Sequence, residues 1–401
     1  MDTQTVYPGS RLTMTSAADL FALPPTDVSI LASNYIVLAS SFDVKSENNT
    51  LMFRVPASSS QYMDLNSSFL YIKVRLVKKD GTKLDSSDIV APSNLFFYNM
   101  FQNCTASING VSVATTDNRY SYQAGLPVLL QNGKGEKDSE LSSILYYPDS
   151  TPDEFDVTKN SGFKTRMDLA SESKTFDMAG PIPINICQQG KYLPPFCTVS
   201  FELSRQSPQI CLDSSSTDKE YKYEVMQAEL HVKMLTMNPE IVARHNLDFG
   251  RGKAQFPIRD TRVRITYIPS GSINFDSEPL VNGKLPTAIV FGLVSEPAIY
   301  GKLNKSPWNF QNFGLKSITV TVDNNPALTH KIDLDFQNNC YLLGYRTLFK
   351  ALGKGKDGNA ISRKDYLAGN ALYLFDIQAS IGAEFHAFRT GELQVRMRNG
   401  N

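Results

Sequence analysis

The chain has 401 residues, a length that predicts two or three domains. Its composition is that of a globular protein, with 41% apolar, 20% charged and 10% aromatic residues. Forty basic residues balance forty acidic ones and no Lys/Arg stripe is present, which argues against nucleic-acid binding as the main activity. The N-terminus lacks a signal-peptide profile and no apolar stretch could span a bilayer, so we expect a soluble protein made in the cytosol.

Alternation of apolar and polar residues, which is typical of half-buried strands, dominates the first half. It covers residues 69–77, 198–204 and 228–235. Asn109-Gly110 predicts a tight hairpin turn, because both residues tolerate positive φ. Residues 119–133 have a weaker helical pattern that is interrupted by a proline.

The second half repeats these features. Residues 263–267, 318–322 and 393–397 alternate, and the continuously apolar residues 288–294 suit a strand covered on both faces. Residues 340–353 are the best helical segment, with an apolar face and a glycine stop. Alternation lapses between residues 237 and 255, which predicts a boundary between two modules.

Short motifs recur in the same frame in both halves. Phe-Gln-Asn begins at Phe101 and Phe310, and Gly-Lys-Gly begins at Gly133 and Gly353. A third Phe-Gln-Asn, at Phe336, falls outside this frame. Strand, turn, Tyr-rich helix and Gly/Lys loop follow in the same order, which predicts two repeats of ordinary domain size. The predicted fold class is all-β, with two sandwiches and a few short helices.

The five cysteines are few and scattered, unlike those of a disulfide framework or a zinc site. Nine residues separate Cys187 from Cys197, and a disulfide between the two is the minor alternative. We therefore expect free core thiols in a reducing compartment. The five residues are Cys104, Cys187, Cys197, Cys211 and Cys340.

No motif of catalysis, cofactor binding or metal binding is found, so we predict no enzyme activity and no such site residues. Asp333 and Asp335 could form a glycosidase pair, but alternation places both on an exposed strand face. Trp308 is expected in the core, and an oligomer contact is its alternative. The basic pairs interpreted as exposed strand surface are Arg262/Arg264 and Arg396/Arg398.

Many weak sequence blocks occur in an order that resembles the major capsid proteins of Polinton/Maverick elements and adintoviruses, from about residue 20 to residue 398. The blocks of the first half are LFALPPTDVSI, YMDLNSSFLYIKVRLVKKDG, APSNLFFYNMFQNCTASINGVSV and YSYQAGLPVLLQNG. Those of the second half are RVRITYIPSG, GKLPTAIVFGLV, SPWNFQNFGLKSITVTVD and YLLGYRTLF.

This resemblance implies a double jelly roll, which is two eight-stranded sandwiches side by side in one chain. It implies homotrimers with a pseudo-hexagonal outline that contact each other, and penton or minor capsid proteins, in an icosahedral shell around double-stranded DNA. No cofactor and no sequence-specific nucleic-acid contact is implied. The implied location is the virion capsid, with synthesis in the host cytosol and assembly in the cytoplasm or nucleus.

In these terms the chain divides into an N-terminal arm (1–49), a first jelly roll (50–240) and a second jelly roll (241–401). One departure is that the second half has no counterpart of residues 209–212 and of the long strand at 223–237, which closes the first sandwich. We expect an incomplete second jelly roll, because the chain is truncated or because another segment completes the sheet.

Two other functions stay open. One is a two-domain β-sandwich carbohydrate-active or carbohydrate-binding protein, with a carboxylate pair in an aromatic-lined groove. The other is a host protein domesticated from a viral element.

Overall fold

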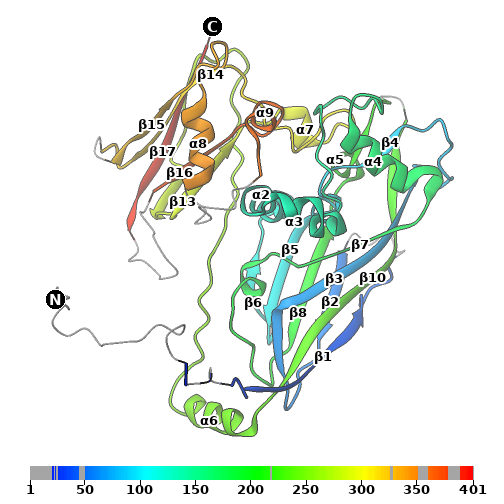
Figure 1. The fold of residues 1–401 in the computed structure, drawn as a ribbon, viewed down its shortest axis with the longest axis vertical. Coiled ribbons are helices and arrows are strands. Elements are labelled where there is room, and N and C mark those ends of the chain that lie inside the picture. The colour runs from blue at the N-terminus through cyan, green and yellow to red at the C-terminus, as the bar shows by residue number, and fades with distance from the viewer. Residues whose placement is uncertain are drawn as a thin grey trace.

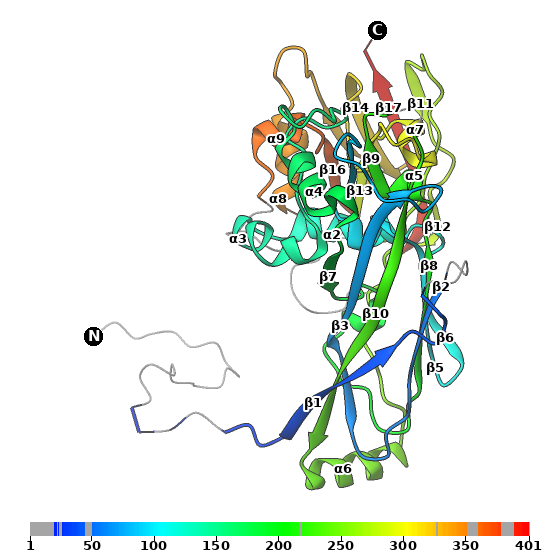
Figure 2. The same ribbon diagram turned by 90° about the vertical axis from the view of Figure 1, so that its right-hand side faces the viewer.

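The computed structural model describes residues 20–21, 23, 26–44, 50–216, 219–325, 328–350, 360–377 and 389–400. These residues form two β-sandwich modules; in Figure 1 the second lies at the upper left, and the first extends from the bottom to the upper right. Short helices lie between the modules and gather along one side, as Figure 2 shows.

Eight strands of the first module form two antiparallel sheets around a shared core. Numbered by their order along the chain, these strands run 1-8-3-6 in one sheet and 2-7-4-5 in the other. This interleaving, in which the first strand pairs with the last, is the jelly-roll arrangement. The first sheet contains β1 (Ile30–Ala39), β10 (Tyr221–Met237), β3 (Tyr62–Lys78) and β7 (Phe176–Gly180); the second contains β2 (Thr50–Val55), β8 (Val199–Arg205), β5 (Phe101–Ile108) and β6 (Val111–Thr115); β4 (Val90–Pro92) and β9 (Leu212–Ser214) pair separately.

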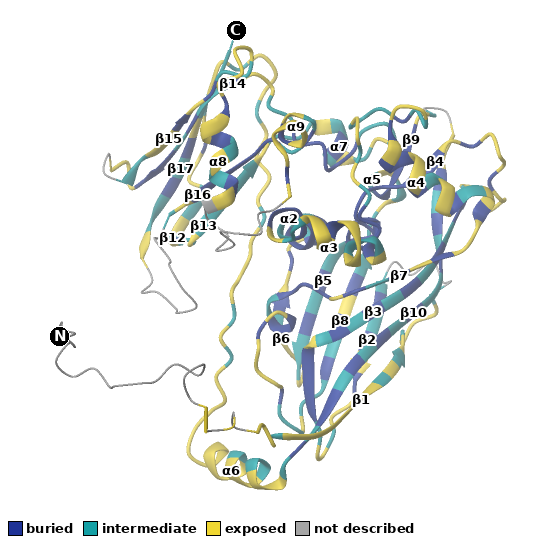
Figure 3. Ribbon diagram, in the orientation of Figure 1, coloured by how far each residue is buried: buried dark blue, intermediate teal, exposed yellow. Residues whose placement is uncertain are grey.

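Alternation decides which side chains of the first module are buried. Leu70, Ile72 and Val74 of β3 have no exposed surface, whereas Tyr71 and Lys73 between them are half-buried. Figure 3 shows the same alternation of burial along the long strands. The strands predicted at 69–77, 198–204 and 228–235 are confirmed as parts of β3, β8 and β10.

The predicted hairpin turn is confirmed between β5 and β6. Asn109 has a φ of 50° and Gly110 a φ of 80°, and the flanking Ile108 and Val111 are paired. Two consecutive residues with positive φ match the twist of the strands that they join.

β1 lies inside the segment that the sequence assigned to an N-terminal arm, residues 1–49. It pairs antiparallel with β10, from Ala32 opposite Thr236 to Ala39 opposite Glu229. This part of the predicted arm is therefore an edge strand of the first sheet. Apolar residues on both of its faces hid the alternation that marks the other strands. Residues 1–19 and 45–49 lie outside the described residues.

The second module repeats this arrangement with shorter strands. In one sheet β11 and β12 both pair with β17, which is followed by β14 and β15, and this sheet corresponds to β2-β8-β5-β6. β13 pairs with β16 as β3 pairs with β7. The strands predicted at 318–322 and 393–397 are confirmed as parts of β14 and β17. The bounds are β11 (Asn274–Asp276), β12 (Val281–Lys284), β13 (Ala288–Gly292), β14 (Leu315–Val322), β15 (His330–Asp333), β16 (Leu372–Asp376) and β17 (Thr390–Asn399).

Among the described residues, none occupies the position of β10 in the second module, so its jelly roll is incomplete there, as expected. β13 confirms the strand expected in 288–294, but it has β16 on one side and no described strand on the other. Its residues are half-buried or exposed instead of covered on both faces. The strand predicted at 263–267 is wrong, because this extended segment has no strand partner among the described residues. The strand of the first module that corresponds to residues 263–267 is β1, whose partner among the described strands is β10.

Both predicted helices are confirmed, as α2 (Tyr120–Gln131) and α8 (Leu342–Lys350). Residues 351–353, with the start of the second Gly-Lys-Gly, lie outside the described residues. In the described part of the chain, no helix is both long and apolar enough to cross a membrane. The other helices are α1 (Phe96–Asn99), α3 (Lys134–Asp138), α4 (Ser161–Ala170), α5 (Pro208–Cys211), α6 (Pro239–Phe249), α7 (Glu296–Tyr300) and α9 (Arg363–Leu367), with short 3-10 turns at Glu140–Ile144, Ser171–Ser173 and Asn185–Cys187.

The connection between the modules begins with α6, in the interval where strand alternation lapses. The Asn238 side chain accepts a hydrogen bond from the backbone N–H of Glu240, and Pro239 takes the first helical position. Residues 250–270 then run along the first module to the second as a mostly exposed segment outside helices and strands, with Phe256 and Ile258 half-buried against the core (Figure 1).

All five cysteines are free thiols. Cys104, Cys187 and Cys211 are buried as expected, whereas Cys197 is half-buried and Cys340 is exposed. The expectation of a core position is therefore wrong for Cys340. Burial raises the pKa of the Cys187 thiol to about 12, so this thiol stays protonated and unreactive at neutral pH.

Candidate functional site: the junction between the modules

Trp308 of the second module packs into the first module against α2. Only 6% of its surface is exposed. Its ring lies 5.4 Å from the ring of Tyr122, whose hydroxyl donates a 3.0 Å hydrogen bond to the carbonyl of Pro307. At Gly125, a Cβ atom would lie 2.2 Å from the indole ring. The expected core position of Trp308 is thus confirmed, and this core is the one between the modules.

A polar cluster fixes the same segment from its other side. Lys305 Nζ lies 3.0 Å from one carboxylate oxygen of Asp153, and the backbone N–H of Ser306 donates a 2.8 Å bond to the other. The backbone N–H of Ser214 donates a 2.6 Å bond to the carbonyl of Leu303. Residues 303–308 are therefore held to the first module by both main-chain and side-chain contacts.

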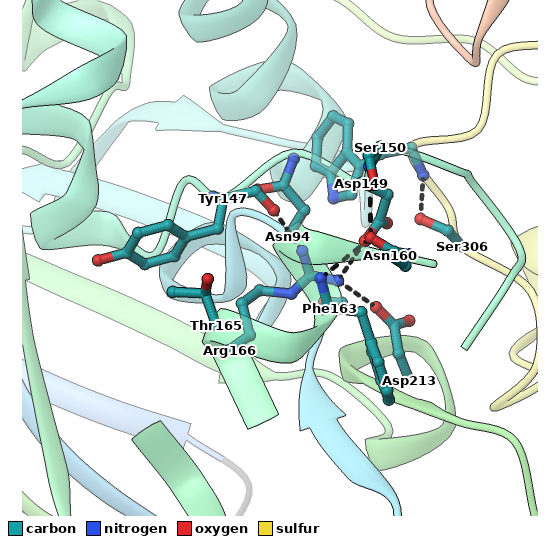
Figure 4. Close-up of polar contacts among 12 residues, drawn as sticks. Asn94, Tyr147, Asp149, Ser150, Asn160, Phe163, Thr165, Arg166, Asp213 and Ser306 are labelled. Atoms are coloured by element: carbon teal, nitrogen blue, oxygen red, sulfur yellow. Dashed lines mark hydrogen bonds and ion pairs between the residues drawn. The ribbon is translucent and has the colours of Figure 1, made fainter. Parts of the chain in front are cut away.

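The loop that carries Asp153 is anchored by Arg166, which has no exposed surface (Figure 4). Its Nη2 contacts Asp149 Oδ1 at 2.8 Å and Asp213 Oδ2 at 3.1 Å. Its Nε donates a 2.8 Å bond to the carbonyl of Pro92, and Nη1 donates to the carbonyl of Tyr147. A guanidinium can be buried in this way because its donors are satisfied by oxygen atoms in fixed positions.

Asn160 completes this network as the N-cap of α4. Its side-chain oxygen accepts from the backbone N–H of Phe163 at 3.1 Å. Its amide nitrogen donates to Asp149 and to the carbonyls of Thr151 and Glu154, at 3.0, 3.2 and 2.9 Å. One buried side chain thus starts a helix and closes the loop that presents Asp153 to the second module.

Asp213 is the strongly perturbed carboxyl of this network. Burial raises its pKa to about 7, because the loss of water outweighs the attraction of Arg166, and Asp149 adds repulsion. Its Oδ1 atom is buried and has no hydrogen-bond partner among the described residues, so this oxygen bears the full cost of losing water. Buried ion networks also perturb pKa values, so this shift alone does not indicate catalysis.

The structure does not bring the other candidate residues together into a site. Lys331 Nζ lies 2.7 Å from Asp333, and Lys316 Nζ lies 3.5 Å from Asp335, so each carboxylate has its own lysine. In the described part of the chain, no cluster of three or more His, Cys, Asp or Glu residues could hold a metal ion. Arg262 and Arg396 contact Asp260 and Asp276.

A surface hollow beside the junction contains three carboxylates. Asp153 is bound to Lys305, while Glu154 and Asp156 lie 3.7 and 3.8 Å from Lys159 Nζ. A second hollow, between β6 and residues 260–263, is lined by no aromatic side chain. Neither hollow joins a free carboxylate pair to an aromatic groove.

Sequence reasoning missed the Arg166 network. Arg166, Asp149 and Asp213 are far apart in the chain and lie in no motif. The local signal that was available is Asn160, an N-cap residue directly before α4.

No protein-family model matches the chain. A protein of Caenorhabditis elegans, called uncharacterized protein F54H12.2, is 22% identical over 305 residues, which cover 74% of this chain and 71% of the relative.

Two of the solved structures that resemble the chain are of a virophage and of a virus capsid. A chain of the Sputnik virophage structure matches with a TM-score of 0.59 and 12% identity, over 98% of this chain and 87% of that one. A chain of the PBCV-1 virus capsid matches with a TM-score of 0.55 and 9% identity, over 94% and 86% of the two chains. With two jelly-roll modules in sequence and this likeness over nearly its whole length, the chain has the double jelly-roll fold.

Proposed function

We propose that the chain is a major capsid protein that assembles with copies of itself into an icosahedral viral shell around double-stranded DNA. We further propose that it is related to the capsid proteins of Polinton/Maverick elements and adintoviruses. The first jelly roll then begins with β1 and ends with β10, and the second spans β11 to β17.

The junction between the modules carries this proposal. Trp308, Asp153 and the buried Arg166 network hold the two jelly rolls in one fixed relation. A shell built from repeated copies requires a rigid block, because its contact surfaces must keep their relative positions. The likeness of this chain to chains of virus particles, over nearly its whole length, also supports the proposal.

The proposed unit is a homotrimer, in which three chains present six similar modules with a pseudo-hexagonal outline. Contacts with other trimers and with penton or minor capsid proteins would complete the shell. The balance of forty basic and forty acidic residues suits assembly by shape, without sequence-specific binding of nucleic acid. The pairing of Asp333 and Asp335 with lysines also fits a structural, non-enzymatic function.

The mass and shape of the purified protein test this proposal. We expect light scattering after size exclusion to give three times the chain mass, and negative-stain microscopy to show ring-like particles with a hexagonal outline. A monomer at every concentration, without such particles, would contradict the trimer. Measurable binding of a glycan by the purified protein would favour the carbohydrate alternative.

A further inference from the structure

The Arg166 network contains one buried guanidinium and two buried carboxyl groups (Figure 4). The exposed fraction of the side chain is 0% for Arg166, 6% for Asp149 and 1% for Asp213. Both carboxyl groups contact the same guanidinium nitrogen, Nη2, at 2.8 and 3.1 Å. With both carboxyl groups ionised, the cluster has an excess negative charge inside the protein, a state that burial disfavours. One bound proton makes the cluster neutral.

The other ionisable groups around Asp213 leave this imbalance in place. Asp153 adds repulsion, and it is paired with Lys305 of the second module. Cys211 of α5 is buried, and burial holds the pKa of its thiol well above the usual value, so the thiol stays neutral. β4, which pairs with β9, has no ionisable side chain in Val90–Pro92. These neighbours add no net charge to the cluster.

The two elements that carry these carboxyl groups also hold the second module. The loop of Asp149 presents Asp153 to Lys305, and β9 presents the backbone N–H of Ser214 to the carbonyl of Leu303. The guanidinium joins this loop to β9, because it contacts a carboxyl group of each. Repulsion between two ionised carboxylates acts against this connection, and therefore against the contacts that depend on it.

We infer that the Arg166 network is a proton-dependent switch of the junction, in which Asp149 and Asp213 share one proton. With the proton bound, the loop and β9 stay together and hold the second module; when the proton leaves to the solvent, the junction weakens. The inference concerns a single chain and does not depend on the proposed assembly.

The sign of the pH dependence follows from the pKa of Asp213, which burial raises from 3.8 to about 7. A carboxyl group that binds its proton more tightly in the folded chain stabilises that fold at low pH. This stabilisation is complete below the ordinary pKa of 3.8 and is lost as the pH rises to about 7. We therefore expect a stronger junction at mildly acidic pH than at neutral pH.

Trp308 is the only tryptophan of the chain and lies in the junction, so its fluorescence reports on this switch. The test is urea unfolding of the full chain, followed by this fluorescence, in the wild type and in Asp213→Asn, which cannot ionise. We expect the unfolding constant of the wild type, relative to the variant, to rise about tenfold per pH unit between about pH 5 and 7 and then to level off. Asp168→Asn is the matched control, because this exposed carboxylate pairs with Lys164 on α4, and it should keep the wild-type profile.

Infrared spectra detect the proton directly. The wild type at about pH 6 should show a protonated carboxyl band that is absent from Asp213→Asn. The band should also be absent from Asp149→Asn, because loss of the second carboxylate lets Asp213 ionise beside Arg166. A ratio of wild-type to Asp213→Asn unfolding constants that stays the same from about pH 5 to 8 would overturn the inference. If Asp213→Asn does not fold, a wild type without this band at about pH 6 would overturn it.

Discussion

Gly125 shows how one residue adapts a helix to the junction. Within α2, alanine would be the better helix former by about 1 kcal/mol, because glycine loses more backbone freedom on folding. Trp308 reverses this preference, since its ring occupies the place where a side chain at residue 125 would begin. Propensity is thus overruled by a contact with a residue of the other module.

This reversal predicts that replacing Gly125 by alanine lowers the free energy of unfolding, although alanine is the better helix former. Gly125→Ala is expected to destabilise the protein by about 1–3 kcal/mol, because the indole ring or α2 must shift. Urea unfolding measures this change. Gly135→Ala is the control, since no atom of the described residues lies within 4 Å of a Cβ added to that α3 residue, and it should be neutral or slightly stabilising. Equal effects of the two changes would refute the close packing.

At the scale of elements, the sheets of the two modules differ in how their strands are flanked. Ile72 of β3 pairs with Ala228 of β10 on one side and with Met178 of β7 on the other. Val290 of β13 pairs only with Leu374 of β16 among the described residues. An antiparallel edge strand leaves every second N–H without a partner in its sheet.

Hydrogen exchange should therefore distinguish β3 from β13. We expect alternate amides of β13 to exchange at least about a hundredfold faster than those of β3, because they need no opening of the sheet. Amide hydrogen exchange of the purified protein, followed by mass spectrometry or NMR, measures these rates. β7, which among the described strands pairs only with β3, serves as the control edge. Full protection of β13 would show that another segment covers its edge.

Sequence alternation predicted strands well where a residue pattern and a pairing partner coincide. Leu70 and Ile72 in β3, and Ile318 in β14, alternate and are buried. Residues 263–267 alternate equally well and form no strand, because pairing depends on a neighbour that the pattern cannot reveal. α6 was missed although Asn238-Pro239 is a recognised start signal and Ile241 and Val242 pack against a core cluster, because the interval was interpreted only from its lapse of strand alternation.

The junction was beyond sequence reasoning for a related reason. Trp308 was expected in a core, but the composition of a segment does not tell which module it enters. Arg166 meets Asp149 and Asp213 only after the chain has folded. Such long-range pairs leave no local trace in a single sequence.

At the scale of the whole molecule, two kinds of connection join the modules. The covalent one, residues 250–270, is mostly exposed, with Phe256 and Ile258 half-buried against the core, and has no strand partner in the described chain. The non-covalent one is the junction around Trp308. Because the junction is the more deeply buried of the two, we expect it to determine how the modules are placed.

Limited proteolysis separates these two contributions. We expect trypsin to cut the exposed connection first, after residues such as Arg259 or Arg264, while the two fragments stay together during size exclusion. Trp308→Ala should allow the cut fragments to separate, since it empties the centre of the junction. Mass spectrometry identifies the cuts. Cut wild-type protein that falls apart at once would show that the connection is what holds the modules.

The exposed connection also has a consequence for how such a gene can change. The entropy cost of a longer loop rises slowly, by about 0.6 kcal/mol for each doubling of its length. Residues 250–255 are all exposed and lie outside every helix and strand. Insertions of new sequence there leave the junction untouched, so this stretch is where the chain can gain a tag, a peptide or a whole domain while its two jelly rolls keep their places.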